Sequence, residues 1–150
     1  MRTSPSPART ANPAAPPEIA ARLRLSATRL ARRLRQESGA GLSPSQHSAL
    51  AVIANHGPLT LGALAEHERV APPSITKVVS KLESDRLVIR TPDPADRRVC
   101  RVAISPEGEA LLEESRRRKT AWLTARISEL DPDRQRRLAD ALDVLDDVIS

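Results

Sequence analysis

Apolar residues recur every three or four positions along most of the chain, which is the period of an amphipathic helix. The clearest stripe lies in residues 72–86, where Ile75, Val78, Val79 and Leu82 share one face. The opposite face carries small hydroxyl groups and two lysines. This segment is predicted to be a short helix that packs on a core with one side. Its other side could approach a polyanion closely, because the hydroxyls are small and lysine neutralises phosphate.

Other segments carry the same period or clear start signals. Ser43, Pro44 and Gln46 have the residue types and spacing of an N-cap, a first helical position and a capping box. Ser105 and Asp131 each precede a proline and mark two later helix starts. The predicted helices outside 72–86 are 18–37, 43–54, 61–67, 106–130 and 132–150.

Residues 87–91 and 99–104 are β-prone runs separated by a charged turn, which predicts a β-hairpin with a basic tip. Leu59 and Thr60 are too few for a strand of their own but can pair with one, and Thr60 can cap the next helix. The helices 61–67 and 72–84 are joined by about four residues, as in a helix-turn-helix, and the hairpin that follows is a wing. The predicted fold class is mainly α with a small β-hairpin wing.

The charge of the chain favours an acidic partner. The net charge is +5, and residues 1–38 hold eight arginines against two glutamates, whereas residues 131–150 hold three arginines against six aspartates. Double-stranded DNA is the first candidate partner and an anionic membrane the second. Trp122 is the only aromatic residue, which excludes nucleic-acid binding that depends on stacking platforms.

Three further segments connect these elements in a recognisable way. Residues 82–90 run from the helix into the wing, Asp93-Pro94-Ala95-Asp96-Arg97-Arg98 forms the turn, and residues 104–108 lead into the next helix. Together they resemble the MarR family of winged helix-turn-helix transcriptional regulators, over residues 18–150. Arg86 departs from the family's usual glycine, so that turn is expected to be strained or different. Ala71 departs from the usual capping Ser or Thr.

The resemblance implies a single domain at 18–150, with a winged core at about 42–105 and dimerisation helices at about 18–38 and 106–150. Residues 1–17 are predicted to be a disordered Pro/Ala-rich tail. The resemblance also implies a homodimer that binds a pseudo-palindromic operator as a sequence-specific, ligand-responsive repressor. A cytoplasmic location is predicted because a chain with one cysteine suits a reducing compartment. The dimerisation residues would be Ile19, Leu23, Leu30, Leu138, Leu142, Leu145, Val148 and Ile149.

The DNA contacts follow from the same resemblance. The major-groove residues are predicted to be Pro73, Ser74, Thr76, Lys77, Ser80 and Lys81, and the wing residues Asp96, Arg97 and Arg98. Asp96 is expected to orient Arg98 toward the minor groove. The recognition face has no Asn, Gln or Arg before Arg86, so DNA shape is expected to carry much of the specificity. A pocket for a small effector would use Arg29, Arg33 and His47, and the effector's identity is open.

The sequence leaves other functions to consider. A winged helix can instead dock an acidic protein, and salt-dependent DNA binding separates the two functions. A membrane binder is disfavoured because the arginine-rich first helix lacks an aromatic apolar face. His67-Glu68 begins a zinc-protease pattern, but Ala71 stands at the second ligand. We therefore predict no enzyme, no cofactor and no metal site. Cys100 is the only cysteine, so the chain cannot form an intrachain disulfide. We interpret Cys100 as inert rather than as a redox sensor.

Overall fold

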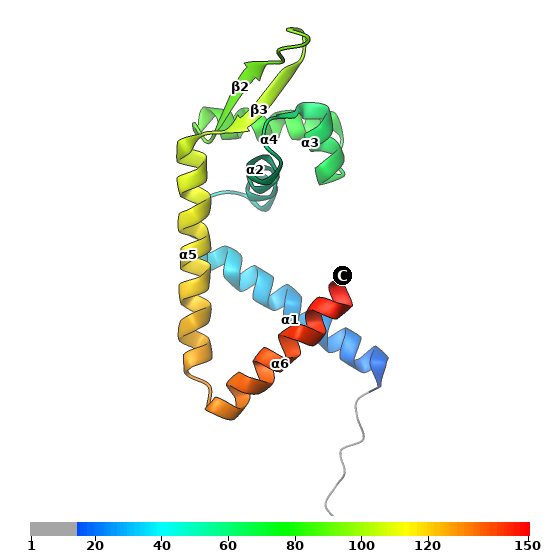
Figure 1. The fold of residues 1–150 in the computed structure, drawn as a ribbon, viewed down its shortest axis with the longest axis vertical. Coiled ribbons are helices and arrows are strands. Elements are labelled where there is room, and N and C mark those ends of the chain that lie inside the picture. The colour runs from blue at the N-terminus through cyan, green and yellow to red at the C-terminus, as the bar shows by residue number, and fades with distance from the viewer. Residues whose placement is uncertain (1–14) are drawn as a thin grey trace, which may run out of the picture. The chain divides into compact units, whose positions relative to one another are not determined.

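The structure, a computed structural model, describes residues 15–150. In Figure 1 short helices gather beside a small sheet, and a long helix leads away from it. The helices are α1 (Pro16–Glu37), α2 (Pro44–His56), α3 (Leu61–Glu68), α4 (Pro72–Ser84), α5 (Pro106–Ser128) and α6 (Pro132–Ile149). The strands are β1 (Leu59–Thr60), β2 (Val88–Pro92) and β3 (Cys100–Ile104). The predicted mainly α fold with a hairpin wing is confirmed.

The first helix begins earlier than predicted. α1 starts at Pro16, so a tail ending at residue 17 is two residues too long, and its residues 1–14 lie outside the described part of the chain. Proline fits the first turn of a helix because the N–H it lacks has no helical partner there. The chain divides into two compact units, one ending at Leu34 and the other spanning Arg35–Ser150, and the single domain at 18–150 stays a prediction.

Four of the helices have the side-chain caps that their sequences predict. Ser43 and Gln46 form a complete capping box at α2, with bonds of 3.2 Å and 2.9 Å. Thr60, Ser105 and Asp131 each accept the backbone N–H three residues later. Ala71 is the N-cap residue of α4 and makes no side-chain hydrogen bond, because its methyl group has no acceptor. Such caps fix where each helix begins and thereby place the short helices of the winged core.

The sheet has the strand order β1-β3-β2, and both pairs are antiparallel. Leu59 pairs with Val102 and Thr60 pairs with Arg101, so β1 adds a short strand to the hairpin. In the hairpin Val88 lies opposite Ile104 and Pro92 lies opposite Cys100. Because Val102 is fully buried and Arg101 is exposed, the sheet turns one face to the core and the other to solvent.

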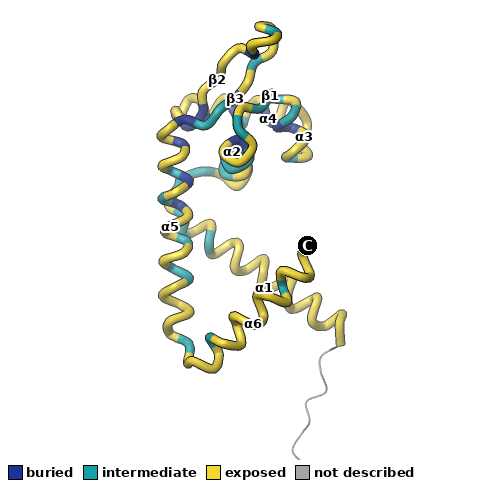
Figure 2. Tube along the Cα trace, viewed as in Figure 1, coloured by how far each residue is buried: buried dark blue, intermediate teal, exposed yellow. Residues whose placement is uncertain are grey.

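The core lies between α2, α3, α4 and the sheet, where Figure 2 shows the buried segments. α4 contributes its predicted stripe to this core. The fully or almost fully buried residues are Ala49, Leu50, Ile53, Leu64, Ala65, Ile75, Val79, Leu82, Val88 and Val102. This shared core holds α4 and the hairpin to one another.

The junction between α4, β2 and α5 is tightly bonded. Arg86 adopts the left-handed conformation with φ 61°, so the turn expected of the family is kept even though arginine replaces glycine. Its carbonyl accepts the Ser105 hydroxyl at 2.6 Å, and the Ser105 N–H donates to Leu87 O at 3.0 Å. The same hydroxyl accepts the Gly108 N–H at 3.0 Å. The first turn of α5 is thereby held against the end of α4.

α6 is exposed along almost its whole length, as the tube in Figure 2 shows. No residue of α6 is buried, and Val148 and Ile149 are 66% and 71% exposed. α1 likewise has no buried residue. Across residues 15–150, none of the helices combines the length and apolar character that a membrane crossing demands.

Candidate nucleic-acid interface

The helix-turn-helix consists of α3 and α4, and the turn between them uses a left-handed residue. Arg69 ends α3 with φ 53°, and its N–H returns to the carbonyls of Ala65 and Glu66. This conformation reverses the chain within a few residues. α4 then begins at Pro72 with its apolar stripe in the core. All six residues predicted for the major groove are exposed, namely Pro73, Ser74, Thr76, Lys77, Ser80 and Lys81.

Three of these six side chains already have partners within the described chain. The Thr76 hydroxyl donates to Pro72 O at 3.0 Å, one turn back along the helix. Lys81 pairs with Asp85 at 2.9 Å, and Ser80 accepts a hydrogen bond of 3.2 Å from Arg90. A contact of these side chains with DNA would therefore compete with an existing bond. As positions of DNA contact, all six stay predictions.

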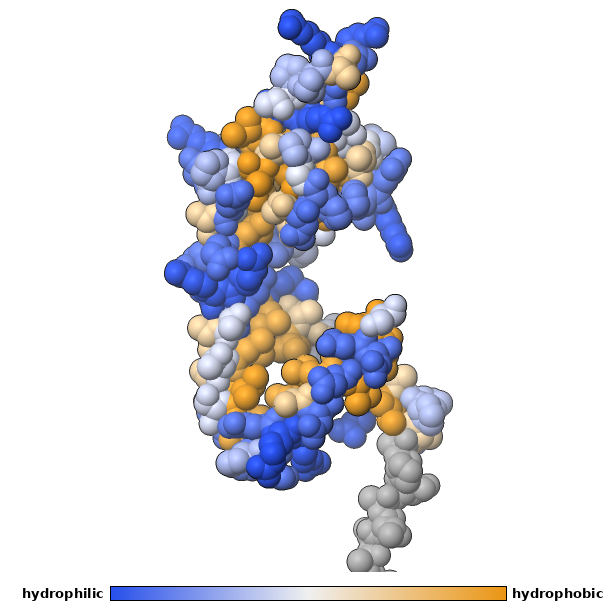
Figure 3. All heavy atoms as spheres, viewed as in Figure 1, coloured by the Kyte–Doolittle hydropathy of each residue, from blue (hydrophilic) through white to orange (hydrophobic). Residues whose placement is uncertain are grey.

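The tip of the wing carries the predicted acid–arginine pair. Asp96 Oδ1 accepts the Arg98 N–H at 3.0 Å and the Arg98 Nε–H at 3.2 Å. The Arg98 side chain is still 92% exposed, and Arg97 is exposed beside it. Figure 3 shows hydrophilic side chains gathered at this end of the hairpin. The bond to Asp96 orients the Arg98 guanidinium and leaves its remaining N–H donors in solvent.

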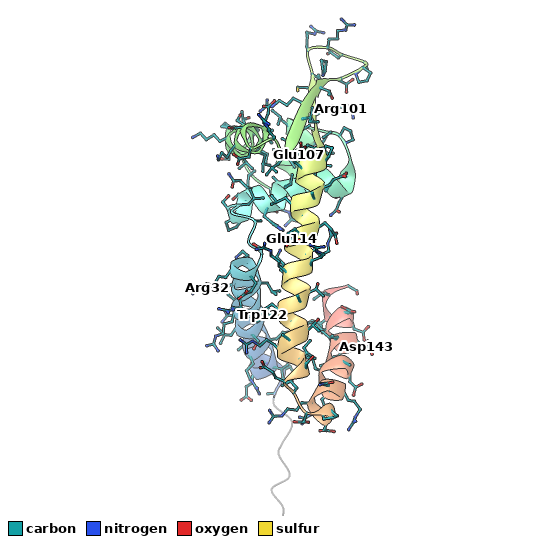
Figure 4. The ribbon with its side chains drawn as sticks, turned by 90° about the vertical axis from the view of Figure 1, so that its left-hand side faces the viewer. Arg32, Arg101, Glu107, Glu114, Trp122 and Asp143 are labelled. Atoms are coloured by element: carbon teal, nitrogen blue, oxygen red, sulfur yellow. The ribbon has the colours of Figure 1, made fainter. Side chains whose placement is uncertain are left out.

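Asp93 organises the wing from inside, and the sequence analysis missed this role. Only 6% of Asp93 is exposed, and its carboxylate accepts the Ala95 N–H at 2.7 Å and the Asp96 N–H at 3.3 Å. It also accepts from Nε of Arg101, which lies on β3 below the tip (Figure 4). The Arg101 bond first, and the Ala95 N–H second, hold the pKa of Asp93 below its usual value. Arg101 reaches further to Pro58 O, at 3.5 Å.

Arg90 is a second residue that sequence reasoning missed. It extends from β2 to α4, where it bonds Ser80 and lies 2.9 Å from the Glu83 carboxylate. Its side chain is only 26% exposed. Arg90 therefore ties the hairpin to the recognition helix. Its position in a β-prone run is the only signal in the sequence, and that position does not reveal the partner.

A small cavity of about 130 Å³ lies between α2 and α5. His47 lines it together with Asn55, Arg116 and Lys119, and apolar side chains complete the wall. His47 Nε2 lies 3.3 Å from Lys119 Nζ. Burial first, and the neighbouring ammonium second, lower the pKa of His47 below 6.5. The other two predicted pocket residues, Arg29 and Arg33, belong to α1, and their part in a pocket stays a prediction.

The predicted dimerisation residues are surface residues in this chain. Ile19, Leu23 and Leu30 of α1 are 52%, 37% and 43% exposed. On α6 every predicted position is exposed except Leu145, which is half-buried. Within residues 15–150 no three His, Cys, Asp or Glu side chains come together in a way that could hold a metal ion. Cys100 is a free, half-buried thiol in β3.

Comparison with known proteins identifies relatives of this chain. The sequence model of the MarR family matches residues 42–100. An HTH-type transcriptional regulator of Mycobacterium leprae is 40% identical over 132 residues, which cover 87% of this chain and 92% of the relative. The HTH-type transcriptional repressor MdtR of Bacillus subtilis is 35% identical over 74 residues, 49% of this chain and 48% of that one.

A solved structure agrees with these relatives. The crystal structure of a transcriptional regulator of Pseudomonas aeruginosa superposes with a TM-score of 0.78 at 32% identity, and the match covers 89% of this chain and 94% of that one. The similarity extends well beyond the winged core, because it includes most of the helices on either side. These proteins are regulators of transcription and not enzymes. The chain belongs to the MarR family of DNA-binding transcriptional regulators.

Proposed function

We propose that this protein is a ligand-responsive repressor that binds a pseudo-palindromic operator in double-stranded DNA as a cytoplasmic homodimer. The observation that carries the proposal is the wing tip. There Asp96 bonds Nε of Arg98, whose side chain stays 92% exposed. A planar, oriented guanidinium suits the narrow minor groove of A·T-rich DNA, beside the major groove that a recognition helix enters.

The homodimer is supported by the apolar surfaces at the two ends of the chain. Exposed leucine, valine and isoleucine side chains line α1 and α6. Covering such apolar surfaces with a partner lowers the free energy, because it removes them from water. A two-fold axis would place two α4 helices in successive major grooves, about 34 Å apart. An operator with matching half-sites follows from that symmetry.

The exposed face of α4 supports different roles for α4 and the wing in DNA binding. It offers Ser74 and Lys77 without a partner among the described residues, and neither side chain makes the bidentate base contacts of Arg, Asn or Gln. We therefore assign phosphate positioning mainly to α4 and a larger share of site selection to Arg98 and DNA shape. Repression is proposed because MdtR, which matches this chain over 74 residues, is named a repressor.

A small anion is proposed as the effector. The cavity between α2 and α5 presents Arg116 and Lys119, with the amide of Asn55 and the ring of His47 beside them. These groups donate hydrogen bonds or carry positive charge, which is the chemistry that binds a carboxylate. The cavity lies next to the winged core, so a ligand there could alter how α5 meets the DNA-binding elements.

The test compares Arg98→Ala with Arg136→Ala, a matched loss of one exposed arginine on α6. A duplex selected by the wild-type protein from a random pool serves as the probe in an anisotropy titration. Arg98→Ala should weaken binding about tenfold and reduce the salt slope by about one. Arg136→Ala should bind as the wild type does.

Two outcomes would contradict the proposal. Equal affinity of the wild type and Arg98→Ala would remove the wing from the interface. Failure of the wild-type protein to select any duplex, or binding that does not weaken with salt, would favour the acidic-protein alternative. Light scattering on the same samples checks the homodimer independently of DNA.

A further inference from the structure

A series of hydrogen bonds connects the segment between α2 and β1 to the tip of the wing. It passes through Arg101, which lies in β3, the central strand of the sheet (Figure 4). The Arg101 guanidinium donates from Nη1 to the carbonyl of Pro58, which follows α2, at 3.5 Å. It also donates from Nε to Asp93, the first residue after β2 and the first of the wing loop, residues 93–99. One side chain thus joins the wing loop to the end of α2.

The Asp93 carboxylate divides its bonds between its two oxygens. Oδ1 accepts the N–H of Ala95 at 2.7 Å and the N–H of Asp96 at 3.3 Å, whereas Oδ2 accepts from Arg101. The backbone closes the same loop, because the Asp93 N–H donates to Val99 O at 2.8 Å and the Val99 N–H donates to Asp96 O at 2.9 Å. Because Asp93 is buried, its carboxylate is shielded from solvent. The wing loop is therefore organised around Asp93.

Asp96 extends these bonds to the guanidinium at the tip. Its N–H is held by Asp93, and its carboxylate accepts the backbone N–H and the Nε–H of Arg98. The series therefore runs from Pro58 through Arg101, Asp93 and Asp96 to Arg98. The Arg98 side chain stands in solvent, so little packing orients it and its direction depends on the loop that carries it.

We propose that Asp93 and Arg101 are positioning residues for DNA binding, which set the place of Arg98 in the minor groove and make no DNA contact of their own. The inference rests on the minor-groove role proposed above for Arg98. The wing and α4 have to meet the same duplex together, and a guanidinium that is already oriented loses less freedom on binding. Pro58 follows α2, which shares the core with α4, so Arg101 ties the wing loop to the body that holds the recognition helix.

A direct phosphate contact by Arg101 is the alternative, since 44% of its side chain is exposed. The bonds of Nε to Asp93 and of Nη1 to Pro58 favour the positioning role, because a move onto phosphate would break them. The two roles also differ in what they need. A direct contact contributes whether or not Arg98 is present, whereas a positioning residue acts only through Arg98. A double-mutant cycle with Arg98→Ala measures this difference.

Two substitutions break the bond between Asp93 and Arg101 from its opposite ends. Asp93→Asn keeps an oxygen that can accept from Ala95 and Asp96, but its NH2 group cannot accept from Arg101. This substitution makes the net charge more positive by one, which by itself favours DNA binding. Arg101→Ala makes the net charge less positive by one. The proposal predicts weaker binding for both variants, whereas a simple effect of net charge predicts opposite changes.

The experiment uses the full chain and the duplex that the wild type selects. Circular dichroism first verifies that each variant is folded at the temperature of the titration, and anisotropy then measures affinity with and without Arg98→Ala. Asp93→Asn and Arg101→Ala should each weaken binding about fivefold, and the two together no more than the stronger one alone. In the Arg98→Ala background each should change the affinity by less than about twofold.

The matched control for charge is Asp133→Asn on α6. Asp133 is also paired with an arginine, Arg136, but it lies outside the winged core. Its loss makes the net charge more positive by one, as Asp93→Asn does, and should leave DNA binding unchanged or slightly tighter. Because the bond is broken from both ends, Arg101→Ala decides alone if Asp93→Asn does not fold.

The possible failures can be told apart. If Arg98→Ala binds as the wild type does, the wing contact and this inference both fall. If Arg98→Ala is weaker while Asp93→Asn and Arg101→Ala bind normally, only the positioning role falls. A loss from Arg101→Ala that is equal in both backgrounds, with normal binding by Asp93→Asn, would make Arg101 a direct phosphate contact. Losses from both variants that persist in the Arg98→Ala background would indicate a general disruption of the wing and would also overturn the inference.

Discussion

Replacing Gly108 by alanine should lower the free energy of unfolding by about 2–4 kcal/mol. Gly108 lies in the first turn of α5, where the backbone passes closely over the end of α4. A Cβ atom at this position would overlap the carbonyl oxygen of Leu87 and would lie 2.9 Å from Ile104 Cγ1. The obstacle is mainly backbone, so it cannot be relieved by turning a side chain.

The magnitude follows from the contacts that would have to move. Forcing an extra carbon into a packed site costs about 1–3 kcal/mol. The shift would also strain the three hydrogen bonds of Ser105, with Arg86 O, Leu87 O and the Gly108 N–H, each worth about 1 kcal/mol. The better helix propensity of alanine returns about 1 kcal/mol. The balance is a clear loss of stability.

Urea unfolding followed by circular dichroism at fixed protein concentration measures this change. Gly62→Ala is the control, since the atom nearest to its new Cβ is Thr60 Oγ1 at 3.9 Å. In α3 that methyl group meets no obstacle, so Gly62→Ala should raise the free energy of unfolding by about 0.5–1 kcal/mol. Equal and small effects of the two substitutions would refute the steric reasoning at Gly108.

Three further predictions use the same denaturation assay. Ala71→Ser should stabilise the protein by about 0.5–1 kcal/mol, because α4 has no side-chain cap; no gain would mean that the serine does not bond the helix. Arg101 holds the pKa of Asp93 low, so the ionised form contributes stability above pH 3.8 that is lost as pH falls through the lower folded pKa. The advantage of the wild type over Asp93→Asn should shrink only in that acid range. Burial and Lys119 lower the pKa of His47, so the wild type should lose stability as pH falls below 6.5, whereas His47→Gln should not.

Local signals in the sequence predicted the elements of the fold well. Ser43 and Gln46 define the start of α2 because a capping box needs only residues three positions apart. The stripe of Ile75, Val79 and Leu82 predicted which side of α4 is buried, since helical periodicity determines direction. The earlier start of α1 was missed because two prolines in a Pro/Ala-rich segment were interpreted as part of a tail.

The interactions that hold the wing could not be predicted in this way. Asp93 was interpreted as one charge of a solvated turn, yet it is buried and bonded to Arg101, eight residues later. Arg90 reaches Ser80 across two different elements. Neither pair has a fixed spacing that a helix or strand imposes, so their partners follow only from the folded hairpin. The positive φ of Arg86 likewise depends on the chain around it, because arginine has no preference for that conformation.

These bonds change how the recognition helix should be understood. Ser80 and Lys81 are predicted to contact DNA, but Arg90 and Asp85 already bind them, so moving them onto phosphate costs existing bonds. Arg98 pays no such cost, because its pairing with Asp96 uses Nε and leaves the end of the guanidinium solvated. The free energy gained per contact should therefore be larger at the wing than at the C-terminal half of α4. The side chains best placed to contact DNA from α4 are then those nearer its start, Ser74 and Lys77, where the positive end of the helix dipole also favours phosphate.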